Sequence, residues 1–201
     1  MNRIELAGIG PGFREPVRDA QQVFRVGMDA LAHPGRIHTL TMDTLAPAGV
    51  GAAANALLLA LLDQDTLLHV SPALGEAAAQ HPRFHTGCRL GALAEADFIL
   101  LAASDAWPDF NTLRQGSEYS PEHSATVIHE VTSFAAGLPL ALTGAGIAAT
   151  QVLRAPELDQ DFVAAWQAMR QRFPRGVDVF LTCGADVVGL PRSTRMEAAC
   201  M

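Results

Sequence analysis

The sequence predicts an α/β three-layer sandwich built on a mixed sheet of about seven strands. Apolar segments of strand length alternate with helical patterns along most of the 201 residues, as is typical of this class. Two β-branched runs within 176–194 flank Cys183-Gly184-Ala185-Asp186 and predict a tight antiparallel hairpin, because glycine supplies the positive φ of a sharp turn. Neither run alternates with polar residues, so helices should cover both faces of the sheet.

The other elements follow from hydrophobic periodicity and from helix breakers. The expected helices are 16–33, 52–62, 73–80, 108–115 and 158–173; the expected strands are 37–42, 66–70, 97–102, 125–131, 138–143 and the two runs of the hairpin. The first helix starts at Pro16, ends before Pro34-Gly35, and carries one apolar stripe made of Val17, Ala20, Phe24, Met28 and Leu31.

Three of these elements carry further expectations. Helix 52–62 is apolar all round, so it should lie sandwiched against the sheet. Pro82 should close the third helix and leave Arg83-Phe84-His85-Thr86 as a loop. Strands 125–131 and 138–143 are close enough in sequence to pair with each other, which together with the hairpin would make the sheet mixed.

A single domain spanning 16–195 is expected, preceded by a loose N-terminal arm (1–15) and followed by a short tail (196–201). The longest apolar run, Ala52 to Leu62, is too short to span a bilayer, and the first residues lack the apolar core of a secretory signal. These features favour a cytoplasmic protein without a membrane contact.

Composition excludes several kinds of chemistry. All 14 basic residues are arginine, so a lysine Schiff base with pyridoxal phosphate is impossible and no cofactor is expected. The three cysteines lie far apart in a pattern that predicts reduced thiols. A net charge of −7, with no basic run, disfavours nucleic-acid binding.

Residues Leu142 to Ala149 fit a loose dinucleotide fingerprint, with Gly144 and Gly146 following an expected strand. No acidic residue lies about 20 positions further on to hold a ribose hydroxyl. The alternative interpretation is a glycine turn between two strands. A free-standing nucleotide-binding α/β enzyme built on the glycine turn 144–146 is therefore one functional hypothesis.

Two groups of side chains resemble ligand or catalytic sites without completing one. His81, His85 and Cys88 suggest metal-ligand spacing, but Pro82 should prevent the two histidines from sharing a helical face, and no fourth ligand is near in sequence. Cys183 lies at the hairpin turn with no histidine in the ribbon to activate it. A polar surface loop and a buried turn thiol are the plainer interpretations.

Arginine forks and neighbouring hydroxyls are the candidate contacts for an anion or for a partner's carboxylate. These candidates are Arg83, His85, Arg192, Ser193 and Thr194, with Arg195 beside them. A solvated arginine surface is the alternative. Between Gly91 and Leu153 the chain is acidic, which suits a basic partner or a soluble surface.

Several short stretches in this order resemble the PhnH family, a subunit of the carbon-phosphorus lyase machinery of phosphonate breakdown. They are Asp19-Ala20-Gln21, Phe24-Arg25, Pro34-Gly35, Arg83-Phe84-His85-Thr86, Leu142-Thr143-Gly144-Ala145-Gly146-Ile147, Phe173-Pro174, Gly176-Val177-Asp178, Leu181-Thr182-Cys183-Gly184 and Pro191-Arg192.

The resemblance implies a fold similar to the large domain of pyridoxal phosphate transferases, without the cofactor and often as a homodimer. It also implies partners, namely PhnG, PhnI, PhnJ and, peripherally, PhnK. With PhnG, PhnI and PhnL, the family is linked to displacement of adenine from ATP by a phosphonate, which yields a ribose 1-phosphonate 5-triphosphate. No catalytic residue is carried over, so the competing hypothesis to the nucleotide-binding enzyme is a subunit that is inactive alone.

Overall fold

The computed structural model describes residues 9–42 and 44–199 of the chain. Residues 1–8 of the expected arm and 200–201 of the expected tail lie outside the described residues. The helices are α1 (Pro16–Ala32), α2 (Ala52–Leu61), α3 (Gly75–Thr86) and α4 (Gln160–Arg170). The strands are β1 (His38–Thr39), β2 (Leu67–Val70), β3 (Arg89–Leu90), β4 (Phe98–Leu101), β5 (Thr126–Glu130), β6 (Leu140–Thr143), β7 (Gln151–Leu153), β8 (Asp178–Cys183), β9 (Asp186–Leu190) and β10 (Arg195–Ala198).

A mixed seven-stranded sheet runs through the molecule in the order β1-β9-β8-β5-β4-β2-β3. The strands from β3 to β8 are parallel, whereas β9 and β1 are antiparallel to their neighbours. The hairpin of β8 and β9 is as predicted: Cys183 pairs with Asp186, and Gly184 adopts a φ of 60° in the turn. The predicted α/β class and the mixed seven-stranded sheet are confirmed.

Side chains alternate between the two faces of this sheet and build two separate cores. Leu100, Ile128 and Phe180 pack with α1, α2 and α3 on one face. The preceding residues Ile99 and Val127, with their counterparts on β8 and β9, pack on the other face with α4. Every residue of α2 from Ala53 to Leu58 is buried, as its apolar sequence predicts.

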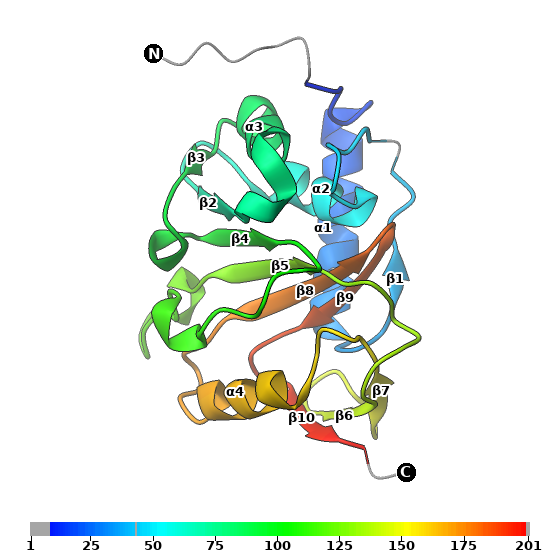
Figure 1. Cartoon of the computed structure of the whole chain (residues 1–201), viewed down its shortest axis with the longest axis vertical. Helices are drawn as coiled ribbons and strands as arrows, with labels where there is room; N and C mark the ends of the chain where they lie inside the picture. Colours follow the sequence, from blue (N-terminus) through cyan, green and yellow to red (C-terminus); the bar gives the residue numbers. More distant parts are fainter. Residues whose placement is uncertain (1–8, 43, 200–201) are drawn as a thin grey trace.

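A second sheet of three strands, in the order β10-β6-β7, completes the layer that contains α4. Figure 1 shows these strands and α4 at one end of the view, with α3 at the other. The predicted pairing of β5 with β6 is wrong, because β5 lies between β4 and β8 while β6 pairs with β10 and β7. Between β5 and β6 the chain crosses from the central layer to an outer layer. The seventh strand of the main sheet is β3, in place of the predicted β6.

Two predicted helices also differ from the structure. Helix 108–115 is only a 3₁₀ turn, Phe110–Thr112, because the Asp109 side chain binds the Asn111 N–H and Leu113 returns to extended backbone. The third helix does not end at Pro82 but continues to Thr86. Strand 37–42 shortens to the two residues of β1. β10 extends beyond residue 195, where the sequence placed the end of the domain.

No helix in the ranges 9–42 and 44–199 is both long and apolar enough to cross a membrane.

Candidate functional site

The outward face of α1 carries an unusual set of exposed apolar side chains. Val17 is 88% exposed, Phe24 49% and Met28 53%. They are separated by seven and four residues, a spacing that aligns side chains in one seam along a helix. The seam is therefore an apolar surface that water contacts in the isolated chain.

Another face of α1 contacts the core. Val23, Gly27 and Ala30 are buried, and a Cβ on Gly27 would lie 3.4 Å from Leu57 and 3.7 Å from Phe180. Small residues thus allow α1 to approach α2 and the sheet closely. The predicted stripe was a correct pattern of apolar spacing, but Val17, Phe24 and Met28 point to solvent, and of its larger members Leu31 packs against the core.

The two histidines of α3 share one helical face, contrary to the prediction. Because the helix continues through Pro82, the rings of His81 and His85 lie 4.6 Å apart between centroids, and Arg83-Phe84-His85-Thr86 forms the last helical turn instead of a loop. Burial, and secondarily the charge of His85, lowers the pKa of His81 to about 4. His81 is therefore neutral at physiological pH.

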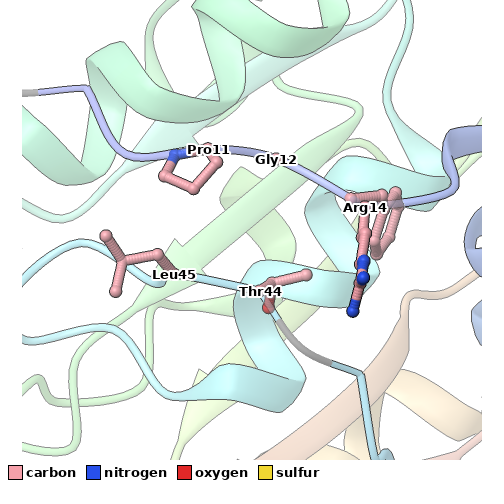
Figure 2. A pocket seen from close by; sticks show the side chains of 6 residues that line it. Pro11, Gly12, Arg14, Thr44 and Leu45 are labelled. Carbon is pink, nitrogen blue, oxygen red and sulfur yellow. The ribbon is translucent and has the colours of Figure 1, made fainter.

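A small pocket beside α3 was not predicted. Its volume is about 380 Å³, and Figure 2 shows the side chains that line it from the N-terminal arm and the loop before α2: Pro11, Gly12, Phe13, Arg14, Thr44 and Leu45. His85 supports the arm, since its Nε2 lies 2.9 Å from the Gly10 carbonyl oxygen. Arg83 is exposed on the same helical turn.

Cys88 follows α3 and is buried, and this burial raises its thiol pKa. Across residues 9–42 and 44–199, no group of three or more His, Cys, Asp or Glu side chains is arranged to hold a metal ion.

Arg192 lies within the protein and is fully engaged there. Its Nε and a terminal nitrogen bind both carboxylate oxygens of Asp178, and its other donors reach the Pro121 carbonyl and the Ser124 hydroxyl. All three guanidinium nitrogens therefore donate to protein acceptors. Arg192 connects the start of β8, the loop before β5 and the end of β9.

The remaining candidates after β9 have different surroundings. Ser193 is partly exposed, Thr194 is buried, and Arg195 is exposed at the start of β10. The structure thus separates Arg83 and His85, at the end of α3, from the group formed by residues 192–195.

The glycine turn connects two antiparallel strands. β6 ends at Thr143 and β7 begins at Gln151, so no helix follows Gly144 and Gly146 to direct its N-terminus at a phosphate. A cavity of about 430 Å³ lies beside this turn, next to His33 and Arg36. The turn lacks the strand-to-helix geometry that dinucleotide binding requires.

Two ionisable residues at the carboxyl end of β5 were missed by the sequence reasoning. His129 is fully buried, with its Nε2 3.0 Å from the Ala102 carbonyl oxygen and its ring against Trp107. Glu130 accepts a 2.6 Å hydrogen bond from the Gly51 N–H at the start of α2. Burial lowers the pKa of His129 and raises the pKa of Glu130. Both shifts favour the neutral form of the side chain.

These two side chains do not form an acid–base pair. Adjacent strand residues point to opposite faces, so Glu130 faces α2 while His129 faces Trp107. A sequence signal existed, because both residues lie near the carboxyl end of the predicted strand 125–131, where α/β proteins place ligands. Their separation by the sheet could not be inferred from it.

A cavity of about 690 Å³ lies beside Trp107 and is lined by acidic side chains that mainly hold the local backbone. Asp105 accepts from the Ala102 N–H, Asp159 from the Phe162 N–H, and Glu157 from the Thr132 N–H. The Cys183 thiol contacts the Thr132 carbonyl oxygen, and burial followed by nearby carboxylates raises its pKa. This raised pKa favours the thiol over the nucleophilic thiolate.

The fold and these sites define an α/β protein with an exposed helical seam, whose ionisable groups largely support its own structure. The family described as "Bacterial phosphonate metabolism protein (PhnH)" matches residues 11–197. The chain therefore belongs to the PhnH family, and the resemblance seen in its motifs is confirmed.

Two curated relatives agree with this assignment. The chain is 37% identical over 187 residues to the alpha-D-ribose 1-methylphosphonate 5-triphosphate synthase subunit PhnH of Rhizobium meliloti (strain 1021), covering 92% of this chain and 94% of the relative. It is 33% identical over 183 residues to the putative C-P lyase subunit protein HtxG of Stutzerimonas stutzeri, covering 88% and 85% respectively.

Proposed function

We propose that this protein is a subunit of a cytoplasmic carbon-phosphorus lyase complex and is inactive alone. With its partners it supports transfer of a phosphonate to the ribose 1-position of ATP with release of adenine. Its family membership and the printed names of its two relatives support the proposal. The proposed partners are PhnG, PhnI, PhnJ and PhnK, and the isolated chain is proposed to form a homodimer.

The observation that carries the proposal is the exposed seam of Val17, Phe24 and Met28 on α1. Its seven- and four-residue spacing suits a partner helix that contributes its own apolar seam. Arg18 and Arg25 are exposed beside it, so acidic residues at the edge of the partner would complement the contact. A catalytic subunit would need a different feature, a set of acid, base and phosphate-binding groups facing one cleft.

Co-purification from cells that express all subunits tests this role. Phe24→Glu and Met28→Glu should each reduce recovery of the partner subunits, because a charge would be buried in an apolar contact. Tyr119→Glu is the matched control, since Tyr119 is 95% exposed and lies far from α1 in the sequence, between the 3₁₀ turns Phe110–Thr112 and Pro121–His123. Full recovery of partners with both α1 variants, or equal loss with the control, would reject the seam as the docking surface.

Arg83 tests a second possible contact. It is exposed at the end of α3, so Arg83→Ala should leave the fold intact. Lost co-purification would identify it as an interface residue, whereas intact assembly with lost turnover would assign it to the substrate. We also propose that the fold resembles the large domain of pyridoxal phosphate transferases.

A further inference from the structure

Two stretches that are far apart in the sequence meet beside the end of α1. Gly35 follows α1, and its backbone carbonyl accepts a 3.3 Å hydrogen bond from the side-chain amide of Gln151 on β7. A Cβ on Gly146 would overlap the Ala32 carbonyl oxygen, so only a glycine fits at that point of the approach. The end of α1 and the loop 144–150 between β6 and β7 are therefore in direct contact.

A cavity of about 430 Å³ lies at this contact, within the range of about 300 to 1,000 Å³ that is usual for small-molecule sites. Its polar side chains come from both stretches: His33 and Arg36 follow α1, while Thr150 and Gln151 lead into β7. None of the described residues that line the cavity is acidic. The lining therefore places two basic side chains and a hydroxyl around one hollow.

One ring nitrogen of His33 is already engaged by α1. Its Nδ1 lies 2.9 Å from a carboxylate oxygen of Asp29 and 3.1 Å from the Asp29 carbonyl oxygen. Because both of these neighbours are acceptors, Nδ1 carries a proton and donates. Nε2 is therefore the ring atom left for a ligand, and in the protonated imidazole it is a donor as well.

The basic groups at the end of α1 outnumber the carboxylate that they contact. Asp29 is shared between two imidazoles, since its second carboxylate oxygen lies 3.3 Å from Nδ1 of His38. Arg36 is exposed, and it belongs to none of the ion pairs formed within residues 9–42 and 44–199. The guanidinium that lines the cavity is therefore available to an anion from outside the chain.

The loop between β6 and β7 adds uncharged donors to the same cavity. Ala148 and Ala149 line it and are exposed, and among the loop hydrogen bonds of the described residues none has either backbone N–H as its donor. Backbone N–H groups and hydroxyls such as that of Thr150 bind phosphate oxygens without adding charge. Both walls of the cavity therefore supply donors.

We infer that this cavity binds a doubly charged oxyanion of the phosphate or phosphonate class through His33, Arg36 and Thr150. A guanidinium presents paired N–H donors to such a group, and two basic side chains suit two negative charges. Pro34 and Ile147 add an apolar wall for a small carbon skeleton attached to the anion. The site differs from a dinucleotide fingerprint, because side chains rather than a helix N-terminus bind the charge. The inference does not rest on the proposed function, since it requires neither a partner subunit nor the α1 seam.

Titration calorimetry of the full chain at low ionic strength tests the site with three probes: inorganic phosphate, methylphosphonate and ribose 5-phosphate. Saturable binding of one ligand per chain is expected for at least one of them. The probe that binds most tightly identifies the source of the oxyanion as the free ion, a phosphonate or a phosphate ester. Arg36→Gln and His33→Gln should each weaken binding by about tenfold, because each removes a charge-assisted hydrogen bond.

Ala149→Asp tests the location of the site without removing a donor. Residue 149 is exposed, so a carboxylate there should leave the fold intact, as circular dichroism can verify, yet abolish binding by repulsion. Arg89→Gln is the matched control for Arg36→Gln, since both replace an exposed arginine and change the net charge equally. Arg89 lies on β3, at the opposite edge of the sheet from β1. The affinity of this control should remain within about twofold of the unmodified chain.

Absence of saturable binding by all three probes would overturn the inference. Equal weakening by Arg89→Gln and Arg36→Gln would do the same, because it would show attraction by net charge alone. Unchanged affinity of the Ala149→Asp variant would place the bound ion elsewhere and reject this cavity. If Arg36→Gln abolished recovery of partner subunits while no probe bound, Arg36 would contact a protein carboxylate and the oxyanion site would be rejected.

Discussion

Replacing Arg192 by alanine should destabilise the fold more than replacing Arg114 by alanine. The guanidinium binds both oxygens of Asp178, the Ser124 hydroxyl and the Pro121 carbonyl, and the two charged side chains are only 13% and 22% exposed. Alanine would keep the 2.8 Å bond from the backbone N–H of residue 192 to Asp178 but lose every side-chain bond.

The expected loss in free energy of unfolding is about 3 kcal/mol. Breaking a buried ion pair costs about 3 to 5 kcal/mol because the remaining charge is left without its partner, and the residual exposure of Asp178 places this case at the lower end. Urea denaturation followed by circular dichroism measures it. The midpoint should fall while the dependence on urea concentration stays constant.

Arg114 is the matched comparison. It pairs with Asp97, but the side chains are 37% and 29% exposed, so solvent screens the charges more strongly. Arg114→Ala should therefore cost about 1 kcal/mol. A loss of less than about 1 kcal/mol for Arg192→Ala, or equal losses for both variants, would refute the argument from burial and bonding.

Three further outcomes follow from the structure. The folded-state pKa of His81 is about 4, below its ordinary value of 6.5, so the unfolded chain binds a proton on this ring more readily than the folded protein does. The stability that neutral His81 contributes is therefore complete above pH 6.5 and is lost as the pH falls toward 4. This loss should reach about 3 kcal/mol and be reduced in His81→Gln but not in the exposed control His123→Gln; identical pH profiles for all three proteins would contradict it. Gly146→Ala should destabilise by more than about 2 kcal/mol, since its Cβ would lie 1.9 Å from the Ala32 carbonyl oxygen, whereas Gly184→Ala meets no atom and should cost about 1 kcal/mol by urea denaturation. Equal losses at the two glycines would show that the close approach is relieved without cost. Incubation with pyridoxal phosphate and dialysis should leave no absorbance at roughly 410–430 nm that borohydride converts into a covalent side-chain adduct, because the sequence has no lysine; such an adduct within the chain would refute this expectation.

The fold was predictable where one short segment determines its own structure. The hairpin of β8 and β9 combines strong β-branched runs with a glycine turn, and α2 is apolar on every side, so each pattern had one plausible structure. Pairing between distant strands was not predictable. β6 follows β5 closely in sequence, yet it pairs with β10 more than fifty residues later.

The direction of apolar side chains and the effect of Pro82 were also beyond the sequence. The seam on α1 has the periodicity of a core face, and only the packing of Gly27 against Leu57 and Phe180 shows that another face is buried. A proline removes one N–H donor, but α3 tolerates it because the neighbouring turns are held by packing. Periodicity therefore identifies an amphipathic helix more reliably than it identifies what covers each face.

The candidate site was predicted only in part for the same reason. The sequence predicts that the arginines and hydroxyls of residues 192–195 contact an anion or a partner's carboxylate, but it does not distinguish them. Asp178 and Ser124, both distant in sequence, satisfy Arg192, while Arg195 has no such partner.

Adenine release tests the central claim, that this chain supports the reaction only as part of a complex. The purified protein is incubated with ATP, magnesium and methylphosphonate, alone and after reconstitution with its partner subunits, and adenine is quantified by chromatography. The account predicts no release above buffer for the chain alone and release that depends on the chain in the reconstituted complex. Adenine formed in proportion to the concentration of this chain alone would contradict it.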